Sequence, residues 1–166
     1  MYLKIEDFIS EWNQESESTV KLFSKIPDNK KAEKVNDNVR SLDRMAWHIT
    51  QTLTEMPHKA GIVEEDVLDN KPVPETFSEI IEIYKKYSDN LIDQLQKKWK
   101  DEDLTIEMEI YGMTWEKRKI LSALVNHQVH HRGQMTVVMR LLDIEVPGVY
   151  GPSKEEWVKY GMKAEE

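Results

Sequence analysis

The clearest helical signal in this sequence is the run FSEIIEIYKKYSDNLIDQLQKKW at residues 77–99. Its apolar side chains recur every three or four positions, so a helix with about 100° per residue gathers them on one face. These apolar residues are Phe77, Ile80, Ile81, Tyr84, Tyr87, Leu91, Ile92, Leu95 and Trp99. The preceding loop at 70–74, NKPVP, contains two prolines that separate the run from what comes before it. The run therefore predicts a long amphipathic helix that packs one face against other elements.

Three other segments repeat this amphipathic pattern. One covers residues 5–26 and stops before a proline, and a second covers residues 42–56 with Ser41 as its N-cap. A third spans about residues 116–142. Four long amphipathic helices predict an all-α fold, a four-helix bundle, in which metal sites can be built from side chains on facing helices.

Two shorter features complete the predicted fold. Between residues 104 and 110 apolar residues occupy every second position, mostly alternating with acidic ones, which predicts a short extended or β segment near 104–114, outside the core. Near the C-terminus, the sequence SKEE at 153–156 has the form of a capping box and opens a short terminal helix. With 166 residues the chain is about one domain long, so we expect a single domain over residues 1–166.

Composition excludes several classes of function. The chain has no cysteine, which excludes disulfides, thiolate metal ligands, cysteine nucleophiles and iron–sulfur clusters. Its 31 acidic and 23 basic residues give a net charge of −8, the wrong sign for binding nucleic acid or anionic membranes. The N-terminus lacks a signal-peptide pattern and no apolar stretch approaches a membrane span, so we expect a cytoplasmic protein. Any thiol chemistry must use an imported thiol.

Two histidines in the last long helix are candidate metal ligands. His127 and His131 lie four residues apart, so a helix places both imidazoles on one side, within the apolar stripe. A buried imidazole needs a polar partner or a metal, and this pair alone fits metal ligation and ordinary hydrogen bonding equally well. His48 lies at the edge of its stripe and could face either this pair or the solvent. For His58 and His130 we expect solvated or capping roles.

The donor set limits the metal and the chemistry. Neutral imidazoles without thiolates suit zinc, nickel, iron or copper rather than magnesium or calcium. Three protein ligands leave at least one coordination position open to water or substrate, whereas structural zinc is usually enclosed by four protein ligands. An open position is typical of a catalytic metal.

Three stretches of the chain together resemble a known family. They are NHQVHHRGQ at 126–134, LDRMAWHI at 42–49 and VPGVYGPS at 146–153. Over nearly its whole length the sequence resembles the DinB-like family of metal-dependent bundles, named for damage-inducible proteins. The resemblance implies a long crossover connection in the bundle, a homodimer, and one divalent transition metal per chain on His48 and the two later histidines. We expect zinc or nickel first, and iron or manganese next.

The resemblance also implies a class of reaction. Family members of known activity use a low-molecular-weight thiol as co-substrate. Our first hypothesis is therefore a thiol S-transferase, in which the metal activates a thiol or water for attack on an electrophilic small molecule. A metal-dependent hydrolase and a non-catalytic, homodimeric, stress-associated metal-binding bundle are the alternatives. The sequence names no catalytic residue beyond the candidate ligands.

Several residues near these motifs have both a functional and a structural explanation. Gln134, one turn beyond the last candidate ligand, could support that histidine from a second shell or could face solvent or a dimer partner. Ser16 and Thr19 interrupt the apolar face of the first helix, and they could lie near a pocket or bond back to helical carbonyls. Arg132 could be a pocket cation for a carboxylate-bearing thiol, but we expect an ion pair with a neighbouring helix. Trp115 could belong to a substrate cage, but we expect a role in packing.

Overall fold

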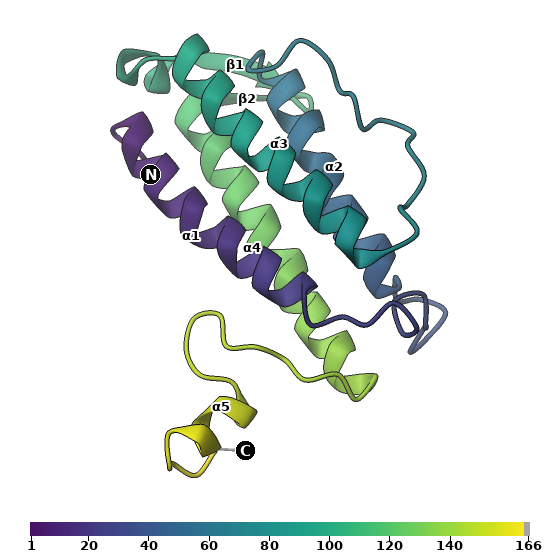
Figure 1. Ribbon diagram of the computed structural model, residues 1–166. Helices are drawn as coiled ribbons and strands as arrows, with labels where there is room; N and C mark the ends of the chain where they lie inside the picture. Colours follow the sequence, from purple (N-terminus) through teal and green to yellow (C-terminus); the bar gives the residue numbers. More distant parts are fainter. Residues whose placement is uncertain (165–166) are drawn as a thin grey trace.

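The computed structural model describes residues 1–164 and is dominated by helices (Figure 1). The long helices are α1 (Ile5–Phe23), α2 (Leu42–Lys59), α3 (Phe77–Lys98) and α4 (Lys117–Leu141), and a short helix α5 (Lys154–Lys159) follows. A 3₁₀ turn at Asp101–Thr105 and two strands, β1 (Glu107–Ile110) and β2 (Met113–Glu116), connect α3 to α4. The predicted helical bundle with an extended segment and a terminal helix is confirmed.

In the bundle, α3 and α4 each pack against both α1 and α2. Figure 1 shows α1 and α4 running in one direction and α2 and α3 in the other. Because α2 and α3 are parallel, residues 60–76 return along the outside of the bundle before α3 begins. This return is the long crossover that the family resemblance implies. It leaves α2 beside α4, and these two helices carry the candidate histidines.

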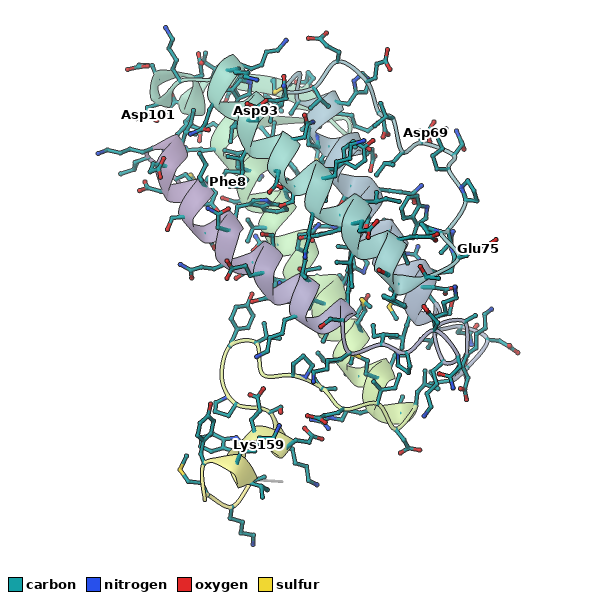
Figure 2. All side chains as sticks on the ribbon, in the orientation of Figure 1. Phe8, Asp69, Glu75, Asp93, Asp101 and Lys159 are labelled. Atoms are coloured by element: carbon teal, nitrogen blue, oxygen red, sulfur yellow. The ribbon has the colours of Figure 1, made fainter. Side chains whose placement is uncertain are left out.

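The apolar faces of the four long helices fill one core. Each helix contributes fully buried side chains, for example Trp12, Ile49, Leu91 and Met135. The outer faces are charged, as Figure 2 shows at Asp93, and no helix within residues 1–164 is long and apolar enough to cross a membrane. Burial of one large apolar side chain contributes about 1.5–3 kcal/mol, so the apolar faces are the main source of the bundle's stability.

The connection between α3 and α4 is an antiparallel hairpin that differs from the sequence prediction in two ways. β1 pairs with β2 through a turn at Tyr111 and Gly112, where φ is 53° and 71°. Positive φ at both positions gives a turn whose twist matches the strands, and glycine adopts it without strain. The sequence pattern does not predict the second strand. The expectation that residues 104–114 lie outside the core is also wrong, because Leu104 and Ile110 are buried where this connection covers one end of the bundle.

The C-terminal segment is tied to the bundle through a buried ion pair. Ser153 caps α5 as predicted, since its hydroxyl accepts a hydrogen bond from the backbone N–H of Glu156. The hydroxyl of Tyr150 donates to the Glu15 carboxylate of α1 at 2.7 Å and accepts from the Arg132 guanidinium of α4 at 2.6 Å. Glu15 and Arg132 are themselves an ion pair, which confirms the prediction for Arg132.

Candidate metal centre

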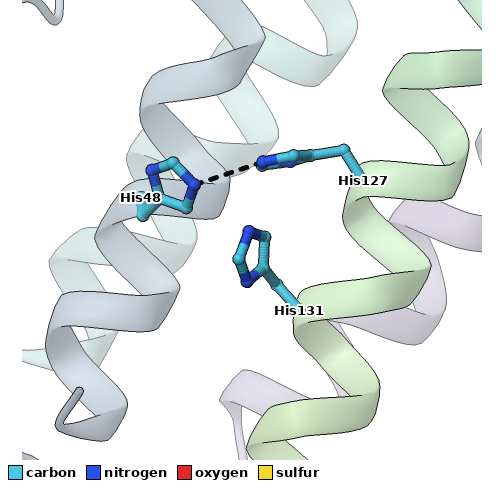
Figure 3. A group of neighbouring side chains, drawn as sticks. All are labelled: His48, His127 and His131. Atoms are coloured by element: carbon cyan, nitrogen blue, oxygen red, sulfur yellow. Dashed lines mark hydrogen bonds between the residues drawn. The ribbon is translucent and has the colours of Figure 1, made fainter. Parts of the chain in front are cut away.

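Three histidines from two adjacent helices converge on one point (Figure 3). His48 lies on α2, whereas His127 and His131 lie about one turn apart on α4. The Nε2 atoms of His48 and His127 are 3.1 Å apart, and the His131 ring centroid lies 4.7 Å from that of His48 and 4.4 Å from that of His127. One nitrogen from each ring lies within 4.8 Å of the other two. The histidines named from the sequence thus form a group that could hold one metal ion.

The hydrogen bonding of these rings fits a metal better than an ordinary polar core. Two nitrogens bound at about 2.0–2.1 Å to one tetrahedral metal lie about 3.3 Å apart, close to the separation of His48 and His127. Nε2 of His127 has another histidine, His48, as its polar partner. Nδ1 of His127 is the one buried side-chain nitrogen or oxygen within residues 1–164 that lacks a hydrogen-bond partner. A histidine buried for structural reasons usually has its polar atoms paired. The donor set suits a divalent transition metal.

Burial keeps the three imidazoles uncharged. Removal from water, reinforced by His131 and by Arg40, lowers the pKa of His48 and His127 from 6.5 to about 4. Burial is also the main cause that lowers the pKa of His131. A neutral imidazole offers a lone pair to a metal, whereas a protonated imidazole must first release its proton. Near neutral pH the group can therefore bind a cation directly.

Gln134 holds the ring of His131. Its side-chain oxygen lies 2.8 Å from Nδ1 of His131, and its amide nitrogen lies 3.0 Å from Nε2 of His130. An amide oxygen only accepts, so Nδ1 of His131 carries the hydrogen and Nε2 keeps its lone pair for a metal. Gln134 is thus placed where it could support His131 if that histidine binds a metal, while His130 is exposed and lies outside the three-histidine group.

A buried glutamine that the sequence analysis missed sets the spacing between the two histidine-bearing helices. Gln128 on α4 is fully buried, and its amide nitrogen donates to the backbone oxygen of Ile49 on α2 at 3.2 Å. The hydroxyl of Tyr84 on α3 donates to the side-chain oxygen of the same glutamine at 3.1 Å. Because Ile49 follows His48 directly, these bonds fix α4 beside the turn that carries His48. The sequence signal that could have identified Gln128 is its position within the apolar stripe of α4.

Two cavities flank the three-histidine group. One of about 570 Å³ is lined in part by His131 and Gln134, and a second of about 320 Å³ is lined in part by His48 and His127. The wall of the smaller cavity also contains Thr52, Glu55, Met56, Tyr111, Trp115 and Ala123. Small molecules can therefore approach the group from two sides.

Three other sequence predictions can be compared with the structure. The hydroxyls of Ser16 and Thr19 donate to carbonyl oxygens of α1 itself, so the structural explanation holds for both. Trp115 packs against the core as expected, but it also lines the smaller cavity. His58 is exposed at the end of α2 and takes no part in the group.

The sequence of this chain matches the profile of a known protein family. The DinB family profile matches residues 1–165. The chain belongs to the DinB family. The resemblance drawn from three short stretches is thereby confirmed over nearly the whole length.

Two solved structures share the fold of this DinB-family chain, and none of the relatives described below is named for a reaction. It is 31% identical over 164 residues to the uncharacterized protein YrdA of Bacillus subtilis strain 168, with 99% of this chain and 98% of that protein covered. A crystal structure of a DinB-like protein from Bacillus cereus matches with a TM-score of 0.80 and 35% identity, covering 90% of this chain and 100% of that one. The DinB-like protein YjoA of Bacillus subtilis matches with a TM-score of 0.68 and 19% identity, covering 86% and 97%. This last likeness shows the fold alone.

The metal-free protein is expected to lose stability as the pH falls from 6.5 to about 4. The pKa of His48 and His127 is about 4 in the folded chain and 6.5 when exposed. The unfolded chain therefore takes up protons first, and stability that is present above pH 6.5 is lost across this window. Urea unfolding after chelation should show a smaller loss for His127→Asn than for the wild-type protein.

The exposed His58 provides the control for this measurement. His58→Asn should lose stability with pH as the wild-type protein does, because His58 is exposed and lies outside the three-histidine group. An identical pH dependence in His127→Asn and the wild-type protein would show that burial at the candidate site does not lower the pKa.

Proposed function

We propose that this DinB-family chain is a metal-dependent thiol S-transferase. In this proposal one divalent transition metal, zinc or nickel ahead of iron or manganese, is held by His48, His127 and His131. The observation that carries the proposal is the convergence of three uncharged imidazoles between two cavities. Small-molecule sites are typically concave and largely apolar with a few convergent polar groups, and this arrangement has that form.

The chemistry follows from the number of ligands. Three histidine ligands leave at least one coordination position of the metal open. A thiol or a water molecule that took this position would have its pKa lowered by the metal. In the transfer, the sulfur forms a bond to an electrophilic carbon and the leaving group departs with the electrons of the broken bond. The thiol proton passes to solvent, so the reaction needs no oxidant or reductant.

The composition and the cavities favour a thiol that comes from solution. The chain has no cysteine, so it offers no sulfur nucleophile of its own. His131 lines one cavity, and His48 and His127 line the other, which allows the thiol and the electrophile to approach from different sides. The smaller cavity is walled in part by Tyr111 and Trp115, whose rings suit an apolar electrophile.

The test uses a panel of thiols with a chloronitrobenzene as electrophile. The protein is purified without a polyhistidine tag and loaded with zinc or nickel. We expect product that requires both metal and thiol and that stops forming after chelation. Product formed with water alone would favour a metal-dependent hydrolase. Metal binding without turnover by either nucleophile would favour a non-catalytic metal-binding bundle.

A further inference from the structure

The larger cavity combines an apolar wall with one arginine. It lies between the loop that precedes α2 and the C-terminal half of α4, and His131 forms part of its wall. Among the described residues that line it, Arg40 is the only charged one. Val137 and Leu141 form an exposed apolar edge, at 60% and 63% exposure. The apolar lining comprises Val35, Val39, Met45, Val137, Val138 and Leu141.

Arg40 and Arg44 differ from the chain's other three arginines because neither has a carboxylate partner within residues 1–164. Arg118, Arg132 and Arg140 are each paired with a carboxylate. Within residues 1–164 the guanidinium of Arg40 forms no ion pair with any carboxylate, although the chain has 31 acidic and 23 basic residues.

We propose that this cavity binds a small molecule with an apolar body and one carboxylate, and that Arg40 receives the carboxylate. A guanidinium presents parallel N–H donors that match the two oxygens of a carboxylate, and the apolar wall accommodates the rest of the molecule. A single guanidinium suits one carboxylate better than a phosphate group, which proteins usually recognise with a cluster of arginines. The inference deepens the proposed function and rests on it for the role of the molecule, which is either the thiol or the electrophile.

Binding of hexanoate and hexanol tests the carboxylate site without any turnover. Calorimetry on the full chain, as purified and again after chelation, should show hexanoate binding about tenfold more tightly than hexanol, as expected for one hydrogen-bonded charge pair. Arg40→Met should bind hexanoate and hexanol with similar affinity. Arg44→Met is the matched control, because it removes the same charge four residues along the chain and outside the cavity lining, and it should keep the difference.

Two results of this binding experiment would overturn the proposal. They are equal binding of hexanoate and hexanol to the wild-type protein, and an unchanged difference in Arg40→Met. Arg40 is exposed, so its replacement should leave the fold intact, which circular dichroism checks. If the protein binds hexanoate through Arg40 but transfers no thiol, the proposed function is contradicted and the carboxylate site is not.

Turnover then assigns the carboxylate to one of the two substrates. The pairs to compare are mercaptopropionate with mercaptopropanol, and chloronitrobenzoate with chloronitrobenzene. Arg40→Met should raise the KM for the acid of one pair by about five- to tenfold relative to its neutral partner. A rise for mercaptopropionate assigns the carboxylate to the thiol, and a rise for chloronitrobenzoate assigns it to the electrophile. No rise for either acid would overturn the claim that the cavity serves the reaction.

Discussion

Replacement of His131 with alanine is expected to weaken metal binding by more than about 100-fold while the bundle stays folded. Loss of an outer hydrogen-bond partner of a ligand costs about 10–100-fold in metal affinity, and loss of the ligand itself should cost more. Thiol-dependent turnover should disappear with the metal. The fold should survive, because four apolar helix faces hold it together and alanine favours a helix. Competition with a metal-binding dye measures the affinity, and thermal unfolding of the metal-free protein measures the fold.

The neighbouring His130 provides the matched control. It is exposed on the same helix and lies outside the three-histidine group, so His130→Ala should change metal affinity by no more than about threefold. Wild-type affinity in His131→Ala would remove that histidine from the site. If the metal-free wild-type protein instead unfolded at ordinary temperature, the metal would be structural, because its binding would then supply folding free energy.

The second large effect concerns stability. Arg132→Met is expected to lower the free energy of unfolding by about 3–5 kcal/mol. Arg132 is 2% exposed, and it donates to the carboxylate of Glu15 and, at 2.9 Å, to the carbonyl oxygen of the same residue. Methionine fills much of the vacated space but leaves a carboxylate buried without its cation, which is the main cost. Urea unfolding at neutral pH measures the change.

A surface arginine on the same helix separates burial from charge. Arg140 pairs with Glu155, and their side chains are 39% and 31% exposed, so Arg140→Met should cost only about 0–1 kcal/mol. The double variant Glu15→Leu with Arg132→Met leaves no buried charge and should regain much of the lost stability. A loss below about 1 kcal/mol in Arg132→Met alone would show that this pair does not hold α1 to α4.

Helical periodicity predicts most of the fold because each long helix keeps one face in a common core. The run at 77–99 becomes α3 with Phe77 at its start, and α1 ends three residues earlier than its stripe suggests. The strand β2 was not predicted, because it forms by pairing with β1 across the hairpin turn, which the alternating pattern before the turn does not show. Periodicity also does not say which helices are neighbours. The crossover was expected from the family resemblance alone.

The candidate site was only partly predictable from the sequence. A spacing of four residues on one helix brings His127 and His131 together. His48 became a candidate ligand only through the family resemblance, because its position at the edge of the apolar stripe allowed it to face either the other two histidines or the solvent. The structure also corrects the expected α4 stripe, since fully buried Gln128 and Arg132 lie within it and the two histidines are only half-buried. Buried polar residues resemble surface residues in a sequence, because the partners that satisfy them lie on other helices.

X-ray absorption spectroscopy of the metal-loaded protein, purified without a polyhistidine tag, tests the three-histidine centre most directly. We expect one zinc or nickel ion per chain, with three imidazole nitrogens at about 2.0–2.1 Å and a further light ligand from solvent. His48→Ala should remove one imidazole from the spectrum. Metal content that stays well below one ion per chain at saturation, or a spectrum of His48→Ala that keeps every imidazole ligand, would contradict the three-histidine centre.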